Sequence, residues 1–227
     1  DRLITGLMTG WVKLGAGDGK DGAAQIAALK GPEWYDLFKA IHKAMVLDAS
    51  GDNAAALEAY EAAASSTDAA SAPDAWLRLI ESFARFHAKD GKSKEALAVI
   101  ERGFEFAPER PSLLALKAEI EAGKPVSPLL SDPQAGAAEV LFQLGSAVRR
   151  DGSEGFALMY LQLALAGAPT SDVTLIQLAG VAENQDRQGE AIAFYDKVAQ
   201  DSAFRRGADL QSGLNLADMD KNDEAVK

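Results

Sequence analysis

The 227-residue sequence contains no cysteine and only two histidines, His42 and His87. The absence of cysteine excludes disulfides, thiol nucleophiles and thiolate metal ligands. The two histidines lack the spacing of a zinc motif such as H-E-x-x-H, so we expect no metal site. No apolar run approaches the roughly 20 residues that are needed to cross a bilayer, and we therefore expect no direct membrane insertion.

Basic residues are also scarce. The chain has 23 Lys and Arg against 34 Asp and Glu, which gives a net charge of −11. A surface that binds the phosphate backbone needs clustered cations. We therefore expect no nucleic-acid partner.

One glycine-rich stretch, LGAGDGKDG at residues 14–22, has the appearance of a phosphate-binding loop. The loop motif G-x-x-x-x-G-K-[ST] fails here, because Leu14 stands at the first glycine and Asp21 at the hydroxyl position. We interpret the stretch as a turn between two helices. No Ser/His/Asp set can be assembled either, so we expect no cofactor, no catalytic residue and no enzymatic activity.

What the sequence does contain is an internal repeat. The steps from Ala157 to Ala191 and from Ala191 to Ala225 are both 34 residues long. Each alanine lies early in an amphipathic segment that follows a turn rich in Gly and Asp, and another amphipathic segment precedes that turn. No segment alternates with period two, so we expect helices, including 111–122 and 188–200, and no sheet.

This pattern resembles the tetratricopeptide repeat (TPR), a helix–turn–helix unit of 34 residues. The copy that fits the family pattern best matches it at Leu141, Leu144, Gly145, Val148, Ala157, Leu161, Ala164 and Pro169. A single helix pair cannot bury its apolar face alone, so such pairs stack. The resemblance implies an all-α fold, namely a right-handed superhelix of antiparallel helix pairs (a TPR-like α-solenoid) with about 12 helices.

The repeat register divides the chain into three regions. We expect N-terminal TPR-like helix pairs over 1–122, a Pro-rich insert over 123–133, and C-terminal TPR repeats over 134–227, the last of which is truncated. The truncation suggests that the sequence is an excerpt of a longer protein.

The insert contains three prolines, which exclude a regular helix there. Two interpretations are open. The insert is either a linker beside a decayed repeat, or a segment whose Val126, Leu129 and Leu130 lie back on the superhelix and fill part of its groove.

The resemblance also implies a binding surface. In the TPR family, fixed positions on the first helix of each pair point into the concave groove. Transferred to this sequence, these positions predict a peptide-binding groove that includes Arg78, Glu81, Arg85, Lys89, Phe142, Ser146, Arg149, Arg150, Ile176 and Asn184. Five of these residues are cations, which favours an acidic segment or a C-terminal carboxylate as the ligand. The alternative is that several of them only complement helix C-termini.

The combined expectation is a non-catalytic scaffold that binds a protein or peptide. Two alternatives remain: the repeat arm of a larger enzyme, and a self-associating module that forms a homo-oligomer. The sequence is similar to alphaproteobacterial TPR proteins, some of which are exported. That bacterial resemblance favours the periplasm or cell envelope over the cytoplasm.

Overall fold

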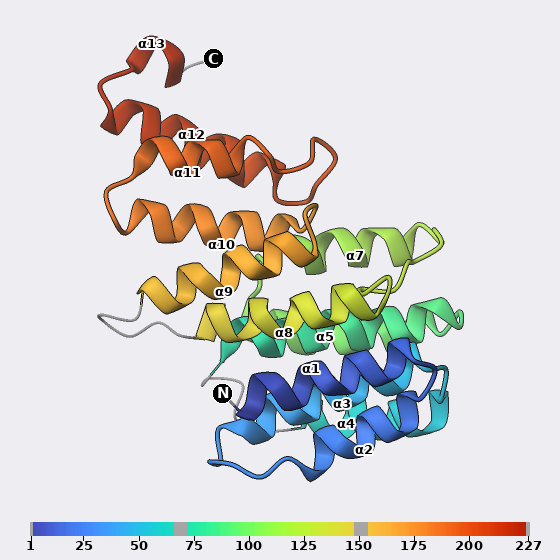
Figure 1. The fold of residues 1–227 in the computed structure, drawn as a ribbon. Coiled ribbons are helices and arrows are strands. Elements are labelled where there is room, and N and C mark those ends of the chain that lie inside the picture. Colours follow the sequence, from blue (N-terminus) through green and yellow to red (C-terminus); the bar gives the residue numbers. More distant parts are fainter. Residues whose placement is uncertain (1, 66–71, 148–153, 226–227) are drawn as a thin grey trace. The chain divides into compact units, whose positions relative to one another are not determined.

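A computed structural model describes residues 2–65, 72–147 and 154–225 (Figure 1). These ranges contain thirteen helices and no strand. The helices are α1 Arg2–Gly15, α2 Gly19–Ala28, α3 Tyr35–Ala49, α4 Asn53–Ala64, α5 Pro73–Lys89, α6 Ser93–Phe106, α7 Pro111–Glu121, α8 Pro133–Ala147, α9 Glu154–Gly167, α10 Asp172–Glu183, α11 Gln188–Tyr195, α12 Arg205–Asp218 and α13 Asn222–Ala225. The all-α expectation is confirmed.

Consecutive helices pack as pairs, most closely α1 with α2, α3 with α4, α5 with α6, and α10 with α11. Short turns join the members of a pair, and Gly17, Gly51 and Gly91 occupy these turns with positive φ. That backbone conformation strains any residue with a Cβ, which is why glycine recurs at these sites. The Asp52 carboxylate then caps α4 by accepting a hydrogen bond from the amide of Ala55 at 3.4 Å.

The stretch LGAGDGKDG is one of these turns. Gly17 has a φ of +89°, and α2 begins two residues later, at Gly19. The Asp18 carboxylate accepts a hydrogen bond from the amide of Asp21, so both aspartates belong to the start of a helix. The interpretation as a turn is confirmed.

Small residues lie where helix axes approach. A Cβ on Gly22 of α2 would lie 2.5 Å from the carbonyl oxygen of Gly10 in α1. A Cβ on Gly103 of α6 would lie 2.5 Å from Leu113 in α7. Such contacts let large apolar residues of one helix fill holes on the next. The fold is a TPR-like helical repeat.

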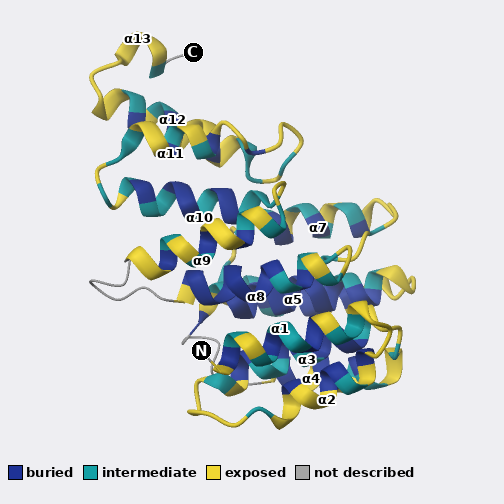
Figure 2. Cartoon of the chain, viewed as in Figure 1, coloured by how far each residue is buried: buried dark blue, intermediate teal, exposed yellow. Residues whose placement is uncertain are grey.

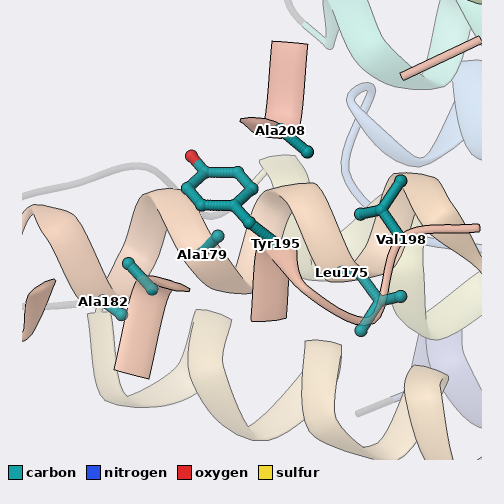
Figure 3. Packing of buried hydrophobic residues seen from close by; sticks show 7 residues of the cluster. Leu175, Ala179, Ala182, Tyr195, Val198 and Ala208 are labelled. Carbon is teal, nitrogen blue, oxygen red and sulfur yellow. The ribbon is translucent and has the colours of Figure 1, made fainter. Parts of the chain in front are cut away.

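The chain divides into two compact units, Asp1–Gln143 and Leu144–Lys227. Unit 1 has a core of large buried side chains that includes Leu3, Leu7, Trp11, Ile26, Ile41, Tyr60, Leu79, Ile80, Ile100, Leu113 and Leu116 (Figure 2). The core of unit 2 joins α10, α11 and α12 through Leu175, Ala179, Ala182, Ala191, Tyr195, Val198 and Ala208 (Figure 3). Three of these residues, Ala191, Tyr195 and Val198, are repeat positions in the sequence pattern.

One expected helix ends early. The sequence predicts a helix over 188–200, whereas α11 ends at Tyr195. The Arg205 guanidinium from α12 donates to the carbonyl oxygens of Tyr195 at 3.2 Å and of Val198 at 2.8 Å. A side chain from the next helix thus satisfies carbonyls that further helical turns would have paired.

Candidate functional site

The first helices of three successive pairs, α1, α3 and α5, contact one another within unit 1. We call their shared surface the N-terminal groove. The groove holds a segment of the chain's own sequence, from Ser127 in the insert to Gln143 in α8. The proline at the start of α8 suits this entry, because the first helical position needs no amide donor.

Gly136 marks the closest approach of α8 to the groove. A Cβ at this position would lie 2.1 Å from the indole ring of Trp11 in α1. The Trp11 indole nitrogen in turn donates a 3.0 Å hydrogen bond to Nδ1 of His42 in α3. Both side chains are buried, so one glycine lets the backbone of α8 lie against a fixed aromatic surface.

A buried ion-pair network continues from that contact. The Arg78 guanidinium of α5 donates to both carboxylate oxygens of Glu139 in α8, at 3.0 and 2.8 Å. A third nitrogen of Arg78 donates to Glu81 at 3.2 Å, and Gln143 donates to Glu139 at 3.1 Å. This two-pronged geometry is the strong form of an Arg–carboxylate pair. Because the pair is desolvated, removal of either partner would leave an uncompensated charge in the interior.

The electrostatics agree with a fully ionised pair. Burial alone would raise the pKa of Glu139, but the Arg78 charge and its hydrogen bonds outweigh burial and hold that pKa below its usual range. Burial also lowers the pKa of His42 to about 4, although the nearby Glu139 carboxylate favours the charged form. His42 is therefore neutral at pH 7, as a hydrogen-bond acceptor at Nδ1 requires.

The network reaches the Pro-rich insert through Arg85. Its guanidinium donates to Glu81 at 3.1 Å and to the backbone carbonyl of Ser127 at 3.1 Å. Leu129 and Leu130 of the insert are half-buried and line a cavity together with residues of α1, α3 and α5. For these two leucines, the contacts agree with the second interpretation of the insert, as a segment that fills part of the groove.

The cavity has a volume of about 400 Å³ and is open on one side. Its apolar lining includes Leu14, Met45, Pro128, Leu129, Leu130 and Pro133. Its polar lining centres on Asp48 of α3, which pairs with Lys89 and accepts a 3.1 Å hydrogen bond from Tyr60. Tyr60 also shares a 2.7 Å hydrogen bond with Ser82, and burial together with Asp48 raises its pKa well above the usual range.

The structure brings some of the sequence-predicted groove residues together. Arg78, Glu81 and Phe142 are buried in one cluster, with Arg78 5.8 Å from the centre of the Phe142 ring. The ion-pair partners of Arg78 and Glu81 are side chains of this same chain, not of a bound peptide. Arg85 and Lys89 keep some solvent access, with 19% and 30% of their side chains exposed.

The remaining predicted residues are spread over other places. Ser146 is buried in the part of α8 that belongs to unit 2. Ile176 is half-buried on α10, and Asn184 is exposed at its C-cap. Arg149 and Arg150 lie outside the described residues.

No pattern in the sequence indicates the roles of Trp11, His42 and Gln143. Their importance depends on the docking of α8 into the groove. That docking joins residues far apart in the chain, such as Arg78 with Glu139, which are 61 positions apart, and Trp11 with Gly136. Repeat periodicity identifies which helical face is apolar but not which later segment covers it.

Two absences hold for the described ranges only. Within them, no set of three or more His, Asp or Glu side chains is arranged to hold a metal ion. No helix in those ranges has the length and apolar character needed to span a membrane.

Comparison with known proteins identifies no family for this chain. No protein-family model and no curated protein matches the sequence. Among solved structures, the chain is similar to one described as the crystal structure of MamA, with a TM-score of 0.38 and 18% sequence identity. That alignment covers 79% of this chain and 86% of the other. A likeness of this strength carries no information about a partner or a binding site.

Proposed function

We propose that the chain is a non-catalytic scaffold that binds a segment of another protein at its N-terminal groove. One observation carries the proposal: the groove already binds polypeptide, namely residues 127–143 of its own chain. Arg85 holds a backbone carbonyl there, and Arg78 holds a carboxylate. A peptide from another protein also carries backbone carbonyls, and it carries carboxylates on its acidic side chains or at its C-terminus.

The partner's place is the part of the groove that the chain's own segment leaves open. The cavity of about 400 Å³ has apolar walls for hydrophobic side chains, and it lies beside the partly exposed cations Arg85 and Lys89. An extended segment with apolar residues and a carboxylate fits this combination, because guanidinium and ammonium groups pair with carboxylates. Arg78, Glu81 and Phe142 then act indirectly, by holding α8 and so shaping the cavity wall.

Residues on α10 give unit 2 a comparable surface. In the repeat register, Ile176 and Asn184 occupy the positions that correspond to Glu81 and Lys89 in unit 1. We propose them as a contact area of unit 2 in its own right for a protein partner, since the exposed helix faces of repeats serve as binding surfaces.

The proposal is tested by capture of partners from cells that naturally make the protein. The variant Arg85→Gln/Lys89→Gln removes both accessible cations without introducing like charges next to Glu81 and Asp48. We expect it to lose specific partners at least tenfold relative to wild type, as measured by quantitative mass spectrometry. Circular dichroism must show an unchanged helical spectrum.

A matched control removes two exposed cations elsewhere. Lys20→Gln/Lys94→Gln makes the same change in net charge on α2 and α6, away from the cavity lining. It should retain every partner. Equal loss in both variants would point to non-specific electrostatic attraction, and retention in both would reject the groove as the binding site.

A further inference from the structure

Helix α9 carries an apolar surface that the groove does not use. Residues 155–171 form a run of 17 positions without Asp, Glu, Lys or Arg, in a chain that is 25% charged. One face of α9 is buried through Ala157, Leu161 and Ala164. The opposite face is largely apolar as well, with the exposed Gln162 at its edge. An uncharged, largely apolar face that is left exposed marks a surface for a partner.

The exposed face forms a single stripe. Phe156, Met159 and Leu163 are 61%, 43% and 50% exposed, and Ala166 is exposed beyond them. Their spacing of i, i+3, i+7 and i+10 keeps them on one side of the helix. Three large hydrophobic side chains in one row differ from the scattered exposed leucines that are normal on a protein surface.

The order of sizes along this stripe makes it self-complementary. Its side chains decrease from Phe156 through Met159 and Leu163 to Ala166. If two copies of α9 lie antiparallel around an axis at residue 161, Phe156 of each copy faces Ala166 of the other, and Met159 faces Leu163. The largest side chain then meets the smallest at each end of the contact, and two side chains of similar, intermediate size meet near its middle, as close helix packing allows.

We propose that α9 is a homodimerisation surface that pairs antiparallel with α9 of a second copy. The self-complementary order of sizes supports a second copy as the occupant, and the lack of charge in the run makes its approach feasible. Two chains of net charge −11 repel each other over most of their surfaces, whereas the uncharged run 155–171 lets them approach without desolvating an ion. This surface belongs to unit 2 alone, and the proposal does not depend on the function of the groove.

The dimer is expected to be weak and to depend on salt. One helix face buries less than the roughly 800 Å² per partner that is typical of a stable interface. Screening of the mutual repulsion should therefore strengthen dimerisation several-fold between about 0.05 and 0.5 M salt. Sedimentation equilibrium of the full chain over a range of concentrations measures both effects.

Two substitutions of the same kind locate the surface. Leu163→Lys places a charge in the stripe and should weaken dimerisation at least tenfold. Leu210→Lys makes the same change at a leucine of α12 that is 63% exposed, and it should leave the dimer intact. A wild-type monomer at every concentration and salt level, or an equal effect of both variants, would overturn the proposal.

The antiparallel register can be tested by disulfide cross-linking. Because the chain contains no cysteine, any disulfide must come from the introduced residues. In the paired helices a cysteine at 156 faces position 166 of the other copy, whereas two copies of either position lie about 15 Å apart along the axis. Mixing Phe156→Cys with Ala166→Cys protein should give a disulfide-linked dimer on a non-reducing gel, and neither protein alone should. Cross-linking of each variant with itself, to the same extent as the mixture, would refute this register.

Discussion

His42 shows how a single buried residue makes stability depend on pH. Its pKa is about 4 in the folded chain and 6.5 in an unfolded one. Between pH 6.5 and about pH 4, His42 is mostly protonated in the unfolded chain but mostly neutral in the folded chain. The free energy of unfolding therefore falls as pH drops below about 6.5, and the loss is complete below about pH 4.

The expected effect of His42 is a loss of about 2 kcal/mol between pH 7 and pH 5. Urea unfolding at the two pH values measures it. In His42→Gln this part of the pH dependence should vanish, even though the variant is less stable at pH 7 because its Trp11 contact changes. The pKa of His87 is also lowered, chiefly by burial, but His87 is present in both proteins and cancels in the comparison. An identical pH dependence in wild type and variant would contradict the placement of His42.

At the residue scale, the repeat register predicted where side chains stand but not what they contact. It placed Arg78, Glu81 and Arg85 together on one face of a helix, and they do form one network there. It did not indicate that the carboxylate for Arg78 comes from Glu139, because that contact spans 61 residues of sequence. Long-range pairs of this kind follow from tertiary docking rather than from local periodicity.

At the scale of elements, the docking of α8 into the groove depends on Gly136. The variant Gly136→Ala would put a methyl group 2.1 Å from the Trp11 ring, and a rigid indole packed in the core has little room to move. We expect a loss of about 1–3 kcal/mol in the free energy of unfolding, measured by urea denaturation.

Gly180 of α10 is the matched control for that substitution. It also lies within a helix, but a Cβ there meets nothing within 4 Å. Gly180→Ala should therefore stabilise unit 2 by about 0.5–1 kcal/mol through helix propensity. If both alanines stabilised the protein, α8 would not lie against Trp11.

Turns and helix starts were the elements easiest to predict. Gly17 adopts positive φ in the stretch that the sequence predicts to be a turn, and α7, Pro111–Glu121, closely matches the helix predicted over 111–122. The end of α11 was not predictable in the same way. The guanidinium of Arg205, ten residues after Tyr195, donates a hydrogen bond to the Tyr195 carbonyl and so caps the helix. No local pattern in residues 188–200 predicts this contact.

At the scale of the whole molecule, two features of the chain belong together. It is a TPR-like helical repeat, and the N-terminal groove of unit 1 is already lined by residues 127–143 of the same chain. A family pattern predicted the first feature. The second follows from the packing of α8 and the insert, for which the three prolines gave only a choice between two interpretations.

Site-specific photo-cross-linking in cells that naturally make the protein tests whether the N-terminal groove binds another polypeptide. A photoreactive residue replaces Leu130, which lines the cavity, or Lys94, which is exposed on α6. The account predicts a defined polypeptide cross-linked from position 130 and absent from position 94. No polypeptide at position 130, or the same products from both positions, would contradict a protein-binding role for this groove.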